Sequence, residues 1–142
     1  MRLVVDTNVL LSALIADSAT RRIIFRAGHE LYYPKDALEE LGHCKGLIRR
    51  KSSVSEKGLD ELISETLKKL EIVDARHFYI KMGEAECIMA PYDKEDAVFI
   101  ALALSIPECA IWSNDKHLRM QEYIPVVTTE ELLKRFGFYS NK

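Results

Sequence analysis

Residues 1–12 read Met1-Arg-Leu-Val-Val-Asp-Thr-Asn-Val-Leu-Leu-Ser12. The rest of the chain is expected to be organised around this segment. The apolar run Leu3–Val5 is typical of a short strand in a parallel sheet that is covered on both faces. The run ends at a carboxylate, Asp6, and a helix is expected to begin near Val9. In open α/β sheets, ligands bind beyond the carboxyl ends of the strands. The sequence therefore predicts an acidic group at a ligand-binding edge.

Strands and helices alternate along the rest of the chain. Further strands are expected at 30–34, 71–74, 109–113 and 125–128. Helices are expected around 23–25 with an end near Gly28, over 37–48, over 77–90 with a turn at Gly83, and over 97–105 and 116–120. Two more are expected to begin at capping boxes. One runs from Ser53–Glu56 to Leu70, and the other from Thr128–Glu131 to Gly137. This alternation predicts an α/β fold with a mainly parallel sheet, in a single domain spanning residues 1–142.

Composition limits the function further. The net charge of −2 excludes a global basic field, so any contact with nucleic acid must use a local patch. The three cysteines have no metal-site spacing and the histidines form no HExxH motif, so free thiols in a reducing compartment are expected and a zinc site is not. No run is long enough for a membrane span, and Asp6 comes too early for the apolar region of a signal peptide. The cytoplasm is the expected location.

Four carboxylates are candidates for chemistry. Asp6 and Asp115 each follow a predicted strand, so parallel strands would bring them to the same sheet edge. Asp96 lies in a first helical turn and shares a face with Ile100 and Ala103, which points it toward the packed side. Glu40 flanks the apolar stripe of its own helix. Such a cluster raises the pKa values of its members unless a cation compensates the charge. All-oxygen sites suit Mg²⁺ or Mn²⁺, which support phosphodiester hydrolysis.

The sequence resembles the PIN-domain nucleases over nearly its whole length. The segments that carry the resemblance, in the order and spacing of that family, are Val4-Val-Asp-Thr-Asn8, Leu38-Glu-Glu-Leu41, Asp93-Lys-Glu-Asp-Ala97 with Ala101-Leu-Ala103, and Ser113-Asn-Asp-Lys-His117. The fold that this resemblance implies is a three-layer α/β/α sandwich around a central parallel sheet. Small members of the family include toxins of the VapC type, which pair with an antitoxin and often form homodimers.

The resemblance also implies roles for individual residues. An acidic quartet of Asp6, Glu40, Asp96 and Asp115 would hold Mg²⁺ or Mn²⁺ and promote attack by water on a phosphodiester, usually in RNA. Supporting polar positions would be Thr7, Asn8, Asp93 and Ser113. Glu40 is preferred to Glu39 because the family's acid directly precedes the apolar residue, here Leu41.

Each of these residues has a structural alternative. Asp6, Asp93 and Asp115 are also suited to cap the helices that follow them. Asp96 could serve only to complement its helix dipole, and both Glu39 and Glu40 could be solvated side chains on an exposed face. These alternatives stay open at the level of single residues. The joint match in order and spacing favours the functional interpretation.

Two basic clusters could contact nucleic acid. Lys45, Arg49, Arg50 and Lys51 form the first, close to Glu40 in sequence. The second consists of Arg21, Arg22 and Arg26. A solvated helix end is the more common role of the first cluster, because cations there complement the helix dipole.

These observations favour a metal-dependent nuclease that acts on RNA, with single-stranded DNA as a second candidate substrate. The alternative is a PIN-fold module with little or no activity that binds RNA or a protein partner. A haloacid-dehalogenase-type phosphatase would have a second Asp at position 8, where this chain has Asn8. A dinucleotide-binding fold would have a glycine-rich turn after the first strand.

Overall fold

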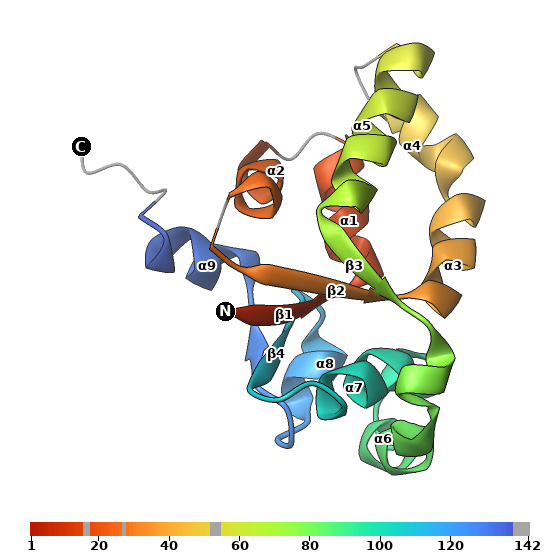
Figure 1. Ribbon diagram of the computed structural model, residues 1–142, viewed down its shortest axis with the longest axis vertical. Coiled ribbons are helices and arrows are strands. Elements are labelled where there is room, and N and C mark those ends of the chain that lie inside the picture. The colour runs from red at the N-terminus through yellow and green to blue at the C-terminus, as the bar shows by residue number, and fades with distance from the viewer. Residues whose placement is uncertain (16–17, 27, 52–54, 138–142) are drawn as a thin grey trace.

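The centre of the computed structural model is a five-stranded sheet in the order β3-β2-β1-β4-β5, and all four pairings are parallel (Figure 1). The structure describes residues 1–15, 18–26, 28–51 and 55–137. The strands are β1 (Arg2–Val5), β2 (Glu30–Pro34), β3 (Leu70–Val73), β4 (Cys109–Trp112) and β5 (Val126–Val127). Each predicted strand is thus present, with its bounds shifted by at most a few residues.

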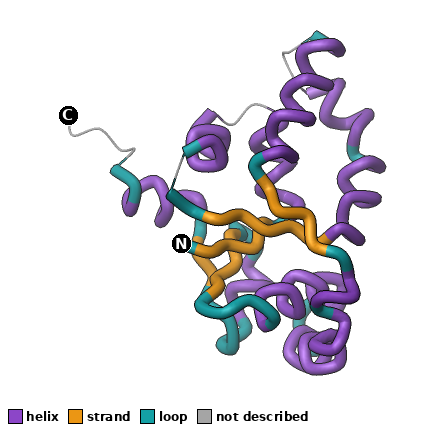
Figure 2. Tube along the Cα trace, viewed as in Figure 1, coloured by secondary structure: helices purple, strands orange, loops and turns teal. Residues whose placement is uncertain are grey.

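Helices cover both faces of this sheet, as Figures 1 and 2 show. The α-helices among the described residues are α1 (Thr7–Ile15), α2 (Ser18–Phe25), α3 (Leu38–His43), α4 (Lys45–Lys51), α5 (Glu56–Lys68), α6 (Met82–Met89), α7 (Ala97–Leu104), α8 (Lys116–Met120) and α9 (Thr129–Arg135). Short 3₁₀ helices lie at Lys35–Ala37, Ala75–His77, Tyr79–Lys81 and Lys94–Asp96. Helices α1 to α5 lie on one face, and α6, α7 and α8 lie on the other. The expected three-layer α/β/α sandwich is confirmed.

Helix α7 forms the core of the second face. Its sequence, AVFIALAL, is apolar all round, as expected for a helix that is buried on every side. It packs against β1, β2 and β4, and Ile100 is completely buried. This packing fixes the position of the residue just before the helix, which is Asp96.

The helix predicted over 37–48 is divided into two. Cys44 separates α3 from α4, and Gly42 and Gly46 lie on either side of it. Glycine is a poor helix former, so two glycines in one short segment weaken a continuous helix. The predicted apolar stripe is kept, because Leu41 and Ile48 both lie in the core.

The two predicted capping boxes have different outcomes. Ser53, the predicted cap of the fifth helix, lies outside the described residues. The described N-cap of α5 is Ser55, whose Oγ accepts a hydrogen bond from Gly58 N at 3.1 Å. The box at Thr128 and Glu131 is present in full at the start of α9.

The helix predicted over 77–90 is shorter than expected. Two 3₁₀ helices occupy residues 75–81, and regular α-helix begins only at Met82. Gly83, predicted to make a turn, lies inside the first turn of α6. The 3₁₀ segment carries the exposed side chains of Tyr79 and Ile80. In the parts of the chain that the structure covers, no helix is both long and apolar enough to span a bilayer.

The central position of β4 predicts a large effect of truncating its core residues. Ile111 is fully buried between β1 and β5. We expect Ile111→Ala to lower the free energy of unfolding by about 2–5 kcal/mol, because it removes buried methyl groups and leaves a cavity. Urea denaturation followed by circular dichroism measures this change. The control is Ile80→Ala at an exposed position, which should change stability by less than about 0.5 kcal/mol. Equal losses in the two variants would contradict the described core.

Candidate active site

Asp6 stands where β1 ends, beside the end of β4. Its backbone N–H continues the ladder by donating to Trp112 O at 3.1 Å, so its neighbour across the sheet is Ser113. The Ser113 hydroxyl donates to Asp6 Oδ2 at 2.6 Å, and both residues are buried. Burial raises the pKa of Asp6 and the charge of Asp115 raises it further, against the hydrogen bonds from Ser113 and Asn8 that lower it. Strand pairing therefore fixes this carboxylate in place.

Ser113 also ties Asp115 to the same edge. Its Oγ accepts a hydrogen bond from Asp115 N at 3.0 Å while donating to Asp6. Asp115 is the N-cap of α8, and its Oδ1 accepts from His117 N at 2.7 Å. The capping role and the placement of Asp115 near Asp6 thus coexist, because one carboxylate oxygen makes the cap and a second oxygen remains.

Asp96 is the most perturbed of the four acids. Its Oδ2 atom is buried and has no hydrogen-bond partner among the described residues. Burial raises the pKa of Asp96 to about 7, with further contributions, in decreasing order, from Asp93, Asp6, Asp115 and Glu40. A buried carboxylate oxygen without a partner is unfavourable in a protein and calls for an explanation. The charges that raise this pKa include the other three acids of the predicted quartet.

Glu40 approaches the same space from α3. Burial raises its pKa, followed by the charges of Asp6 and Glu95, while a hydrogen bond from Thr7 lowers it. The hydroxyls of Thr7 and Tyr33 lie 2.7 Å apart in the core, and Tyr33 donates to Ala37 O at 3.1 Å. This network holds Thr7 beside Glu40. The sequence gave no reason to single out Tyr33, because its strand contains a second tyrosine, Tyr32.

The chemistry of this cluster fits a divalent cation. Carboxylate oxygens are the donors that Mg²⁺ and Mn²⁺ prefer, and Asp96 supplies one with no other partner. Among the described residues, no three His, Cys, Asp or Glu side chains already stand close enough together to form a ready-made metal site. The fit therefore rests on the type and charge of the donors.

Comparison with known proteins places the chain in a family. The sequence model of the PIN domain matches residues 4–136. The chain belongs to the PIN domain family. Its fold is similar to a chain in the crystal structure of VapBC2 from Rickettsia felis bound to a DNA fragment from their promoter, with a TM-score of 0.68 and 13% identity over 90% of this chain and 98% of that chain. No curated protein matches the sequence.

The remaining polar positions of this PIN domain contribute in different ways. Asn8 is exposed and reaches Asp6 through its backbone N–H, 3.4 Å from Asp6 Oδ1. Asp93 caps the 3₁₀ turn before α7, where its Oδ1 accepts from Glu95 N at 3.1 Å. Both the capping alternative and the acidic contribution of Asp93 to Asp96 are therefore present.

The basic cluster on α4 is partly engaged with α5. Lys45 pairs with Asp60 at 3.7 Å, and Arg49 pairs with Glu56 at 3.1 Å. Arg50 and Lys51 are exposed at the end of α4, which Figure 1 shows leading away from the sheet. In the second cluster, Arg21 donates to Ala13 O and Arg26 stacks over the Phe136 ring. Any contact of either cluster with nucleic acid remains a prediction.

The raised pKa of Asp96 predicts how the stability of the metal-free protein depends on pH. The unfolded chain loses the Asp96 proton near its ordinary pKa of 3.8, whereas the folded protein keeps it until about pH 7. Stability therefore falls as the pH rises through this window and stays low above it. We expect Asp96→Asn to become more stable relative to wild type between about pH 4 and pH 8.

Urea unfolding with EDTA at several pH values checks this expectation. Glu61→Gln is the control, because Glu61 is exposed on α5 and should leave the pH dependence of wild type unchanged. If the difference in free energy of unfolding between Asp96→Asn and wild type were the same at every pH, the charge of Asp96 would not destabilise the folded protein.

Proposed function

We propose that this PIN domain is a nuclease that uses Mg²⁺ or Mn²⁺ to hydrolyse phosphodiester bonds. PIN domains are a family of nucleases, and this chain has an acidic residue at each of the four expected positions. The observation that supports the proposal most is the partnerless buried oxygen of Asp96, whose pKa is raised by burial and by the charges of Asp93, Asp6, Asp115 and Glu40. Such a group is costly unless a cation binds there.

The four acids and Ser113 have different proposed roles. Asp6, Glu40, Asp96 and Asp115 would hold the cation, which supplies positive charge at the attacking water and at the leaving oxygen. Ser113 keeps Asp6 oriented through its 2.6 Å hydrogen bond. Asp6 directly follows β1, and Asp115 lies three residues after β4, where its backbone N–H donates to Ser113 Oγ.

RNA is the proposed substrate, since the resemblance to PIN-domain nucleases favours it over single-stranded DNA. A module without activity, acting through RNA or protein binding, is the alternative. The intact set of four acids favours the enzyme, because a binding module would have no need of a partnerless buried carboxylate.

Cleavage by matched variants tests the proposal. We expect wild type to cut a pooled RNA substrate with Mn²⁺ or Mg²⁺ and not with EDTA. Asp96→Asn and Glu40→Gln should each lower the rate at least about 100-fold, because even residues that only support a metal ligand cost 10- to 100-fold when changed. Glu39→Gln is the matched control, being exposed on the same helix beside Glu40, and should cut like wild type. Cleavage by Asp96→Asn at the wild-type rate, or cleavage by wild type in EDTA, would contradict the proposed metal-dependent nuclease.

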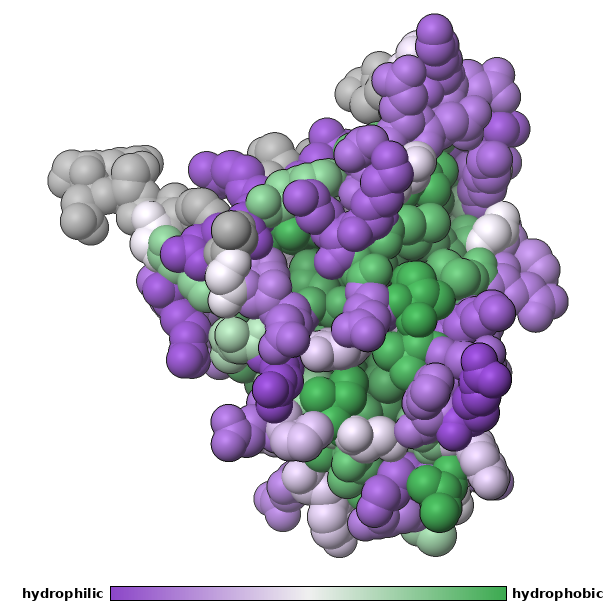
Figure 3. Space-filling model, viewed as in Figure 1, coloured by the Kyte–Doolittle hydropathy of each residue, from purple (hydrophilic) through white to green (hydrophobic). Residues whose placement is uncertain are grey.

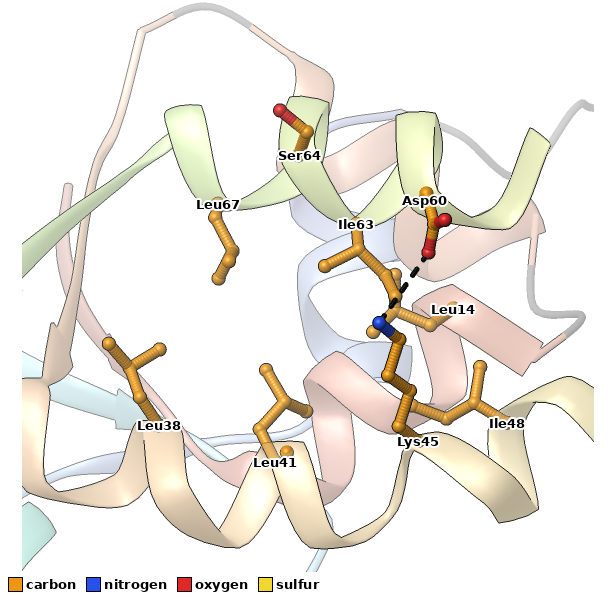
Figure 4. A pocket seen from close by; sticks show the side chains of 10 residues that line it. Leu14, Leu38, Leu41, Lys45, Ile48, Asp60, Ile63, Ser64 and Leu67 are labelled. Atoms are coloured by element: carbon orange, nitrogen blue, oxygen red, sulfur yellow. Dashed lines mark ion pairs between the residues drawn. The ribbon is translucent and has the colours of Figure 1, made fainter. Parts of the chain in front are cut away.

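We also propose that an antitoxin-like protein partner docks in the groove between α3, α4 and α5. Figure 3 shows hydrophobic residues gathered on this face between α3 and α5, with hydrophilic ones over α4. The groove encloses about 520 Å³ and is lined by Leu38, Leu41, Ile63 and Leu67 among others. In Figure 4 these side chains point toward one another, and the Lys45–Asp60 ion pair crosses the space near one end. Gly42 also lines the groove, and a Cβ added there would meet nothing within 4 Å.

An apolar helix face with one charged residue would complement this groove. One solved structure with a similar fold is that of VapBC2. The alternative occupant of the groove is a second copy of this chain.

Co-expression with a candidate antitoxin tests the partner proposal. Ile63→Glu should abolish co-purification, because it places a charge among the apolar side chains of the groove. Glu61→Lys is the control, at an exposed position on the same helix outside the groove lining. Retention of the partner by Ile63→Glu would rule out this groove as the docking site.

A further inference from the structure

A second hollow opens at the same edge of the sheet as the acids. It encloses about 380 Å³ and is lined by residues that include Asp36, Glu40, Phe78, Tyr79, Met82 and Val98. A volume of this size falls within the range of pockets that bind small ligands. Neither the capping and packing of the fold nor the proposed acidic quartet accounts for this pocket.

The topology connects this pocket to the acidic cluster. Strands β2 and β3 are parallel to β1 and β4, so all four end at one edge. Asp36 follows β2, and Phe78 and Tyr79 follow β3 (Figure 1). Glu40 lines the pocket and is also close enough to Asp6 for that charge to raise its pKa. The pocket and the acidic cluster are therefore neighbours that share one side chain.

The lining of the pocket favours a flat, uncharged ring that carries N–H donors. Phe78, Met82 and Val98 form apolar walls, and Tyr79 offers an aromatic ring that is 65% exposed. Asp36 has no hydrogen-bond or ion-pair partner in the described part of the chain, so its carboxylate is free to accept. A phosphate would be repelled by Asp36 and Glu40. A nucleobase combines a stacking surface with amino and imino donors.

We propose that this pocket binds one unpaired nucleobase of the substrate, next to the phosphate held at the acidic cluster. This inference rests on the proposed nuclease function and specifies its substrate. A base inside a duplex cannot enter the pocket without leaving its stack and its pair. The pocket therefore selects single-stranded or unpaired segments, with Tyr79 as the stacking residue and Asp36 as the acceptor that favours bases with N–H donors on their edge.

Loss of base stacking gives the test. In wild type, replacing the nucleotide beside the cleaved bond by an abasic one should lower kcat/KM about 5- to 150-fold, the range of one lost stacking contact. Tyr79→Ala should lower kcat/KM for the intact oligonucleotide by a similar factor and be insensitive to the abasic change. Tyr79→Trp should restore both the rate and the sensitivity, because tryptophan also stacks. Tyr123→Ala is the matched control, a tyrosine that is 71% exposed and lines a different hollow.

Binding separates this inference from the nuclease proposal. Fluorescence anisotropy of the same short oligonucleotides on Asp96→Asn, with and without Tyr79→Ala, requires no turnover. Weaker binding of the abasic oligonucleotide that depends on Tyr79 supports the pocket even if wild type cuts nothing. Three results would each overturn the pocket assignment. The first is equal kcat/KM and equal affinity for wild type and Tyr79→Ala, and the second is an equal loss of kcat/KM in both proteins when the base is removed. The third is no binding of any oligonucleotide.

Discussion

The structure depends most on the parallel pairing of β1 with β4. These two central strands are buried on both faces, and their register places Asp6 beside Ser113 where both strands end. Because the core fixes this register, the 2.6 Å hydrogen bond between them is set by packing and not by the site itself. Asp115 and the start of α8 then follow from Ser113. The acidic cluster is a consequence of how the two strands pair.

The sequence alone predicted the strands better than it predicted the helices. Apolar runs such as Leu3–Val5 leave few alternatives, and all the predicted strands are present. The prediction of one continuous helix over 37–48 was wrong. The spacing of apolar residues shows which residues share a face, but it does not reveal the break at Cys44. The 3₁₀ segment before α6 was missed for the same reason. Predictions of which residues share a face succeed where predictions of helix continuity fail.

For the site, the sequence suggested candidate acids but not their surroundings. Asp6, Asp115 and Asp96 were predicted from strand ends and helix faces, and in the fold the charges of Asp6 and Asp115 both raise the pKa of Asp96. Tyr33 was not predicted, since its contact with Thr7 joins residues that are distant in sequence. The partnerless oxygen of Asp96 is likewise a property of packing around α7. Residue type and spacing reveal which groups carry charge, whereas solvation depends on three-dimensional contacts.

Helix α3 separates two hollows. Leu38 and Leu41 face the apolar groove, and Glu40 on the opposite side faces the acids and the neighbouring pocket. A helix of six residues is too short to bend between these two faces, so a displacement on one side is passed to the other. An occupant of the groove that displaced α3 would also move Glu40, on the other side of the helix. Because the groove is separate from the acids, a ligand bound at the acids would not compete directly with such an occupant.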